Sequence, residues 1–147
     1  MIPRLAELEP ASATTRSFLA EIRDRGFSGD RADDLATRVV GATDNSIYQI
    51  LPQAIVYPRT TEDVAILMRT AARDAFRDLK LTARGGGTGT NGQSLTSGIV
   101  VDVGRHMNRI GARSGDVVEV EPGVVLDQLN AALAPDGLFF APNLSPS

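Results

Sequence analysis

The sequence predicts an α/β protein with a small mixed sheet, which contains a βαβ unit and carries flanking helices. Short runs of β-branched residues that stop at proline or glycine indicate buried strands. Apolar residues at helical spacing separate two of these runs and recur towards both ends of the chain. A glycine-rich run, RGGGTGTNGQ from Arg84 to Gln93, follows the second strand of the unit. With 147 residues the chain is long enough for one domain with its own core.

Residues 1–52 are predicted to form a helical N-terminal extension. A first helix over residues 15–25 is marked by apolar residues at helical spacing, Phe18, Leu19 and Ile22. Gly26 is a suitable terminator for it. A second helix is expected over residues 31–40, with an apolar side of Leu35, Val39 and Val40. The turn-rich segment TDNSIYQILP, residues 43–52, is expected to be a loop that three side chains tuck onto the domain, Ile47, Tyr48 and Ile50.

The βαβ unit begins at residue 54. The run AIVYP is short, rich in β-branched residues and stopped by Pro58, so it predicts a buried strand. A helix is expected over residues 60–76, because Thr60 or Thr61 can cap it and its first turn is acidic. Its predicted apolar face consists of Val64, Leu67, Met68, Ala71 and Ala72. The run LKLTA, residues 79–83, is the second strand and should be parallel to the first.

Further strands and one helix are predicted beyond the glycine-rich run. GIVVDV, residues 98–103, is a third strand, and RHMNRI is a turn into a short strand. Residues 117–123 alternate apolar and acidic side chains, as a strand with one solvated face does. A helix over residues 124–133 carries a leucine stripe, Leu126, Leu129 and Leu133. LFFAP, residues 138–142, is a final strand or extended piece.

Composition excludes several classes of function. The net charge of −3 and the scattered basic residues argue against a nucleic-acid-binding protein. The absence of cysteine and the single histidine leave no disulfide, thiolate metal site or zinc cluster in this chain. The apolar runs are too short to cross a bilayer, and the first residues do not resemble a signal peptide. A cytoplasmic protein without a transmembrane segment is therefore expected.

The glycine-rich run predicts a loop that binds phosphate. Five of the fourteen glycines lie within residues 85–92. Glycine permits positive φ and close approach to the backbone, and consecutive amide groups form a concavity for anions. Side-chain donors surround this run, namely Arg84, Thr88, Thr90, Asn91 and Gln93. The alternative is a solvent-exposed turn between two strands, which would need fewer glycines.

The better-known phosphate loops do not fit this context. Gly87, Gly89 and Gly92 match G-x-G-x-x-G, but a dinucleotide-binding fingerprint needs a helix after the third glycine, and a strand follows instead. Asp102 comes too early for the acidic residue of that fingerprint. A Walker loop needs a lysine and then serine or threonine after its last glycine, whereas Gln93 directly follows Gly92 here. A kinase loop would be followed by an Ala-x-Lys strand, which is absent. The phosphate is therefore expected to bind without a helix dipole behind it.

Five motifs in order resemble a known family. VYPRTTEDV, TARGGGTGTNGQ, GIVVDVGRHMNRI, VEVEPGVVLDQLNAAL and LFFAPNLSPS are similar to the N-terminal FAD-binding subdomain of the vanillyl-alcohol-oxidase/PCMH flavoproteins. With TDNSIYQILP upstream, the chain most resembles the bacterial FAD- and iron–sulfur-containing dehydrogenases of D-2-hydroxyacids, such as D-lactate, glycolate or D-2-hydroxyglutarate. Residues 53–147 would be the first FAD-binding subdomain.

The resemblance implies which residues contact FAD. The pyrophosphate would be held by Gly85, Gly86, Gly87, Thr88, Gly89 and Thr90, with Arg84 at the entrance of the loop. Three further residues would continue along the cofactor, Asn91, Gly92 and Gln93. Pro58 would lie near the adenine, and the backbone of Pro122 and Gly123 would meet the cofactor. Pro142 would begin another segment in contact with FAD.

The resemblance also implies that other parts of a longer protein complete the site. The chain is expected to end before the second FAD-binding subdomain, and the substrate pocket and any [4Fe–4S] cluster would lie outside it. We therefore assign no catalytic residue and no metal ligand here, and leave the electron acceptor open. By itself the chain should be inactive and should hold FAD poorly, because truncation exposes apolar surface.

Several alternatives remain open at this point. The chain could be a nucleotide- or phosphate-binding module without redox chemistry. Asp102 and His106 are spaced like an acid–base pair, although we favour a structural turn in which Met107 and Ile110 pack inward. Asp44 and Tyr48 could approach the flavin region, but the packed loop described above is favoured.

Overall fold

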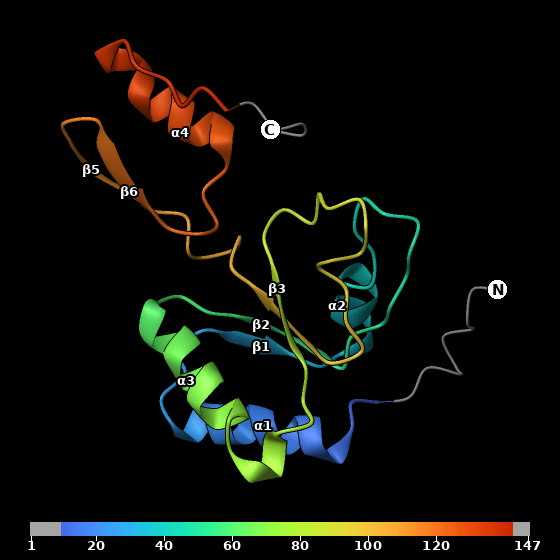
Figure 1. Ribbon diagram of the computed structural model, residues 1–147. Coiled ribbons are helices and arrows are strands. Elements are labelled where there is room, and N and C mark those ends of the chain that lie inside the picture. Colours follow the sequence, from blue (N-terminus) through green and yellow to red (C-terminus); the bar gives the residue numbers. More distant parts are fainter. Residues whose placement is uncertain (1–9, 143–147) are drawn as a thin grey trace.

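The computed structural model describes residues 10–142 and shows an elongated molecule with two parts (Figure 1). The helices are α1 Ala13–Asp24, α2 Leu35–Val40, α3 Thr61–Ala71 and α4 Leu126–Leu133. The strands are β1 Asp30–Ala32, β2 Ala54–Tyr57, β3 Leu81–Arg84, β4 Ile99–Asp102, β5 Ile110–Ser114 and β6 Val117–Val120. One part is a sheet with α1, α2 and α3, and the other is the β5–β6 hairpin with α4 (Figure 1).

The main sheet has the strand order β1-β2-β4-β3. β2 and β3 are both parallel to β4, so the predicted βαβ unit is confirmed, with β4 inserted between its two strands. β1 pairs antiparallel with β2 at the other edge. Because Arg84 pairs with Asp102 at the ends of β3 and β4, the segments that follow these strands leave the sheet side by side.

Both faces of the central strands are buried. Ala54, Val56, Ile99 and Val101 share a core with α1 and α3 on one face, while Ile55 on the other face meets Gly41 at the end of α2. This two-sided burial explains the continuous apolar runs in β2 and β4.

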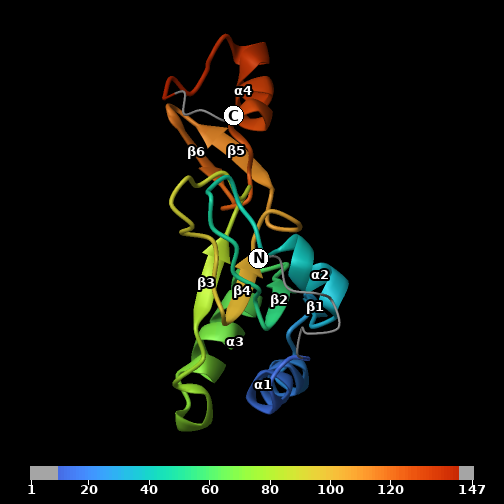
Figure 2. The same cartoon turned by 90° about the vertical axis from the view of Figure 1, so that its right-hand side faces the viewer.

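Helix α1 is part of the core on that first face. Its three predicted apolar residues, Phe18, Leu19 and Ile22, are buried, as predicted. The Phe18 ring packs edge-on against Phe76, with 5.4 Å between ring centroids. Ser12 caps the helix by accepting a hydrogen bond from the Thr15 amide. Figure 2 shows α1 and α3 at the same end of the molecule, away from α4.

The apolar face predicted for α3 is wrong at Met68 and Ala72, which are exposed, whereas Ala71 packs against the core as predicted. Leu67 is buried, but Met68 is 59% exposed and the buried positions include Asp63 and Thr70. Asp63 is inside because its carboxylate accepts hydrogen bonds from the Ser28 amide at 2.7 Å and the Arg59 amide at 2.8 Å. These bonds rotate the helix away from the orientation that hydrophobicity alone favours.

The helix predicted over residues 31–40 is also shorter than expected. Residues 30–32 form β1, and α2 begins only after Asp34, which accepts a hydrogen bond from the Thr37 amide at 3.0 Å. Val40 is 77% exposed, so the predicted apolar side is wrong. The buried residue of α2 is Arg38, whose Nε donates to the Pro52 carbonyl at 2.7 Å.

The elements before residue 52 share the core with those that follow. α1 packs on α3, and β1 extends the sheet through β2. The division of the chain into residues 1–52 and 53–147 stays a prediction.

The second part of the molecule is a hairpin with one helix. β5 and β6 pair antiparallel across a turn in which Gly115 has φ +60°. The turn predicted for RHMNRI is present, and Met107 is buried there. In α4 only Leu129 is fully buried, and residues 138–142 form no strand. Across residues 10–142, no helix has both the length and the apolar character to cross a membrane. The expected cytoplasmic location stays a prediction.

We predict that Asp63→Ala lowers the free energy of unfolding by about 2–4 kcal/mol, because it removes a buried carboxylate and leaves the part-buried amides of Ser28 and Arg59 without their acceptor. Burial would raise the pKa of Asp63, but the hydrogen bonds from Ser28 and Arg59 outweigh it and hold that pKa below its usual value of 3.8. The stabilisation should therefore be complete above the usual value and be lost as the pH falls through the lowered pKa.

Urea unfolding measured from about pH 6 down to about pH 3 checks both statements. Asp33→Ala, at an exposed position, is the control and should change little. An equal loss in both variants, or a wild-type protein that gains stability in acid relative to Asp63→Ala, would contradict this account of Asp63.

Candidate functional site

The glycine-rich loop, residues 85–93, lies at the carboxyl end of β3. The Val103 amide donates to the Arg84 carbonyl at 2.9 Å, which continues the β3–β4 pairing by one residue. Gly85 therefore leaves the sheet beside the turn that follows β4. No helix follows the loop before β4, as the sequence predicts. Ligands in open α/β sheets bind at such carboxyl ends.

The backbone conformation of the loop requires glycine at two positions, and a third glycine packs closely against a side chain. Gly87 and Gly92 have φ of +67° and +72°, a conformation that side chains disfavour. A Cβ atom on Gly89 would lie 2.5 Å from Cδ of Gln93. The Gln93 side chain accepts a hydrogen bond from the Asn91 amide at 3.0 Å, and this bond stabilises the second half of the loop.

The first half of the loop presents bare backbone. Gly85 has no atom within 4 Å of the position that a Cβ would occupy, and Gly86 has only a methyl of Thr88 at 3.4 Å. Among residues 10–142, the amide groups of residues 86–90 have no hydrogen-bond acceptor. Successive amides of this kind are suited to bind an anion, and the missing side chains let it approach closely.

The loop of residues 43–50 packs beside the glycine-rich loop (Figures 1 and 2). The Asn45 amide donates to the Gly87 carbonyl at 3.0 Å, and Arg84 Nη1 donates to the Thr43 carbonyl at 2.9 Å. Ser94 Oγ, just beyond the glycine-rich loop, donates to Asp44 Oδ2 at 3.0 Å. Polar contacts therefore join the two loops.

This arrangement corrects the prediction that apolar side chains tuck the 43–50 loop onto the domain. Ile47 is 94% exposed and Tyr48 is 54% exposed. The sequence signal for the true arrangement was the run of short polar residues Thr43, Asp44, Asn45 and Ser46, which are suited to turns and to side-chain-to-backbone bonds.

Two carboxyl groups near the loops have shifted pKa values of opposite sign. Hydrogen bonding from Ser46 is the main cause that lowers the pKa of Asp44, and the positive charge of Arg84 adds to it. Burial raises the pKa of Asp102 at the end of β4, although its Oδ1 accepts from the Gly104 amide at 3.0 Å. The charge of Arg84 thus lies near both carboxyl groups at this edge of the sheet.

The structure does not join Asp102 and His106 into an acid–base pair. His106 Nε2 lies 2.7 Å from Oδ2 of Asp30 in β1, and Arg59 also contacts Asp30 at 3.1 Å. His106 therefore links the turn after β4 to the edge strand. Among residues 10–142, no group of three or more His, Cys, Asp or Glu side chains is placed to hold a metal ion.

Gly123 is brought to the same edge of the sheet as the glycine-rich loop. Its amide donates to the Met107 carbonyl at 2.8 Å, and a Cβ atom on Gly123 would lie 2.9 Å from Cα of Gly104. Gly104 in turn lies close to Gly85. The Gly85 carbonyl oxygen is 3.7 Å from the position that a Cβ on Gly104 would occupy. Pro122, the neighbour of Gly123, is exposed.

The two remaining predicted residues lie apart from this cluster of backbone. Pro58 is fully buried at the end of β2, next to Tyr57, whose ring has the Arg105 guanidinium 4.5 Å from its centroid. Pro142 is exposed at the end of the described residues. No backbone hydrogen bond within residues 10–142 joins either proline to the glycine-rich loop, and their contact with FAD stays a prediction.

Comparison with known proteins identifies the family. Residues 52–147 match the model of the FAD binding domain family. The chain is 50% identical over 149 residues to D-2-hydroxyglutarate dehydrogenase of Escherichia coli and 55% identical over 149 residues to that of Pseudomonas putida. Each alignment covers 100% of this chain and 15% of the relative, so the chain spans a small part of these proteins' length.

A solved structure shares the fold at low identity. Alkyldihydroxyacetonephosphate synthase superimposes with a TM-score of 0.72 and 18% identity, over 92% of this chain and 30% of that one. The predicted α/β fold of the PCMH type is confirmed.

We predict that Gly87→Ala destabilises the chain by about 1–3 kcal/mol, because alanine is strained at this φ and its Cβ would collide with the Arg84 guanidinium. Gly85→Ala is the matched control, since the space around Gly85 is open, and should change stability by no more than about 0.5 kcal/mol. Urea unfolding of both variants provides the measurement. Equal stabilities would show that the loop does not hold the described conformation.

Proposed function

We propose that this chain, which belongs to the FAD binding domain family, forms the pyrophosphate-binding part of an FAD site. The observation that carries this proposal is the run of amide groups at residues 86–90, which have no acceptor within the described residues and stand at the carboxyl end of a parallel strand. Two negatively charged phosphates of one ligand can accept several such donors together.

The loop fits this cofactor in charge and in shape. Gly85 and Gly86 leave room for phosphate oxygens, and the Arg84 guanidinium beside Gly87 contributes a positive charge. Asn91, Gly92 and Gln93 would continue along the cofactor, and the backbone at Gly123, which packs against the turn after β4, would approach it. When bound, FAD supplies the redox chemistry, and the residues of this chain bind and orient it.

For the whole protein we propose an oxidoreductase that acts on a D-2-hydroxyacid. Its support is the identity of at least 50% to two proteins named D-2-hydroxyglutarate dehydrogenase, which makes D-2-hydroxyglutarate the first substrate to test. The substrate pocket, the electron acceptor and any iron–sulfur cluster would lie in other parts of such a protein. The alternative, a nucleotide-binding module without redox chemistry, uses the same loop.

We predict that the 147-residue chain binds FAD in the micromolar range or more weakly, and binds riboflavin, which has no phosphate, at least about tenfold more weakly still. One charge-assisted hydrogen bond contributes roughly 1.5–3 kcal/mol, which is enough for such a difference. Titration followed by flavin fluorescence measures both affinities, and inorganic pyrophosphate should compete with FAD.

Equal affinity for riboflavin and FAD would contradict the phosphate-binding role of the loop. Tighter binding of another nucleotide, such as ATP, would favour the alternative module. Submicromolar binding of FAD would refute the expectation that this chain forms only part of the site.

A chimera tests the oxidoreductase proposal. In it this chain replaces the segment of the Escherichia coli relative to which it aligns. We predict that the chimera purifies with bound flavin and oxidises D-2-hydroxyglutarate, and that Gly87→Ala in the chimera lowers the flavin content. A folded chimera without flavin would contradict the proposal.

A further inference from the structure

We propose that Tyr48, which the loop of residues 43–50 carries, forms part of a second wall of the FAD site and packs its ring against an aromatic ring system of FAD. This inference rests on the proposed binding of FAD by the glycine-rich loop. It assigns a contact to a residue outside that loop, 44 positions before Gly92 in the sequence.

The 43–50 loop is fixed in place before any ligand binds. Asp44 accepts hydrogen bonds from the Ser46 amide at 2.9 Å and from Ser94 Oγ at 3.0 Å. The Ile50 amide donates to the Ala42 carbonyl at 2.9 Å, and Thr43 pairs with Gln49, so the two ends of the loop are joined. The backbone of such a loop loses little conformational entropy on binding a ligand.

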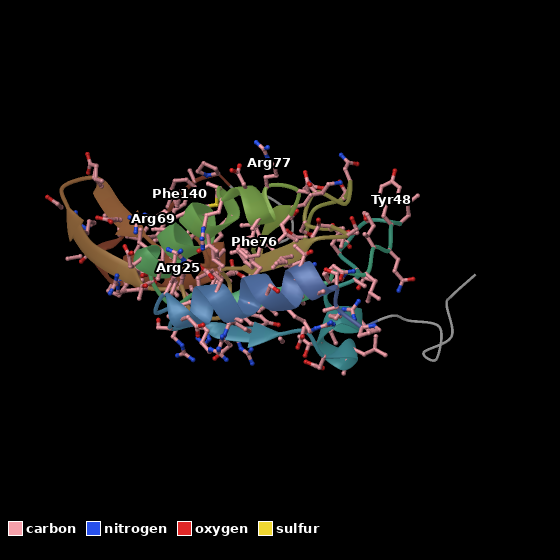
Figure 3. The ribbon with its side chains drawn as sticks, turned by 90° about the horizontal axis from the view of Figure 1, so that it is seen from below. Arg25, Tyr48, Arg69, Phe76, Arg77 and Phe140 are labelled. Atoms are coloured by element: carbon pink, nitrogen blue, oxygen red, sulfur yellow. The ribbon has the colours of Figure 1, made fainter. Side chains whose placement is uncertain are left out.

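Tyr48 stands at the border between the two loops. Its amide donates to Ser46 Oγ at 3.1 Å, which directs the residue outward from the braced turn. Cδ2 of its ring lies 3.0 Å from the position that a Cβ on Gly92 would occupy, so the ring rests on bare backbone of the glycine-rich loop. Figure 3 shows the Tyr48 side chain projecting from its loop, and 54% of it is exposed.

These features match the way in which proteins hold planar rings. One edge of the Tyr48 ring is supported by the backbone at Gly92, and more than half of the residue is open to solvent there, in the same loop as the amides that would hold the pyrophosphate. A ligand fixed there by its phosphates carries an aromatic ring at each end. Stacking of a base on an aromatic side chain contributes roughly 1–3 kcal/mol, and offset stacking is a favoured geometry.

Ile47 provides a matched comparison within the same loop. It is more exposed than Tyr48, at 94%, and it comes directly before Tyr48 in the chain. No glycine of the glycine-rich loop has an Ile47 atom among its nearest neighbours, whereas Gly92 has two from Tyr48. Exposure alone therefore does not distinguish Tyr48, but its position against Gly92 does.

The test titrates FAD into the 147-residue chain carrying Tyr48→Ala, Tyr48→Phe or Ile47→Ala. Tyr48→Ala should weaken FAD binding about tenfold, which corresponds to about 1.4 kcal/mol. Tyr48→Phe keeps the ring and should bind within about twofold of the wild type, since its exposed hydroxyl adds little. Ile47→Ala should not change the affinity. Urea unfolding of each variant should give the wild-type midpoint, because Tyr48 and Ile47 are exposed.

ADP and FMN identify the ring that Tyr48 meets. If Tyr48 packs on the adenine, Tyr48→Ala weakens binding of ADP and leaves FMN unchanged. If it packs on the flavin ring, the variant weakens binding of FMN and leaves ADP unchanged. An equal loss for both ligands would indicate general damage to the loop and would overturn the inference.

Two further outcomes separate this inference from the proposed function. Wild-type affinity for FAD in Tyr48→Ala, with FAD still binding in competition with pyrophosphate, overturns the role of Tyr48 and leaves the phosphate site intact. Absence of saturable binding of FAD by the wild-type chain, up to millimolar concentration, overturns the proposed function and this inference together.

Discussion

The parallel pairing of β4 with β3 is the constraint on which the candidate site depends. It places Arg84 opposite Asp102, so the glycine-rich loop and the turn after β4 leave the sheet as neighbours. Gly123 then packs against that turn, backbone against backbone, where a Cβ would have no room. Segments from three separate parts of the sequence thus meet at one edge of the sheet. The residues in closest contact are glycines, namely Gly85, Gly104 and Gly123. A site made of backbone amides needs such close approach, because side chains would hold the segments and the ligand apart.

The glycine-rich loop is costly to order, since glycine loses more conformational freedom on folding than other residues do. Contacts from the 43–50 loop offset part of that cost. The Asn45 amide donates to the Gly87 carbonyl, and the Arg84 guanidinium donates to the Thr43 carbonyl. The Ser94 hydroxyl donates to the Asp44 carboxylate. Within the described residues these contacts use carbonyls and side chains around the loop and leave the amides of residues 86–90 without an acceptor. The glycine-rich loop is therefore ordered before the cofactor binds, which lowers the entropic cost of binding.

Strands β2 to β6 and the glycine-rich loop could be predicted from sequence because local patterns determine them, whereas β1 lies partly where a helix was predicted. AIVY and IVVD are buried on both faces and are therefore continuous apolar runs, and the absence of a helix after Gly92 is visible in the residues that follow it. The errors arise where a distant polar partner decides. Asp63 is buried because the Ser28 amide, 35 positions away, donates to it, and this bond turns α3 so that Met68 faces solvent. Similarly, the 43–50 loop is held by Gly87 and Ser94, and its own apolar residues gave no indication of those contacts. The spacing of apolar residues predicts which side chains are buried, but it does not predict which distant amide donates a hydrogen bond to a carboxylate.

The most direct measurement of the central claim is a titration of the ¹⁵N-labelled chain with FAD, followed by the amide signals in two-dimensional NMR spectra. If the amides of residues 86–90 donate to the pyrophosphate, their proton signals should move downfield, and by more than those of the β5–β6 hairpin and α4. ADP should reproduce these shifts, because it carries the same pyrophosphate group. Saturable binding of FAD that leaves the signals of residues 86–90 in place, with the largest changes elsewhere in the chain, would contradict the account.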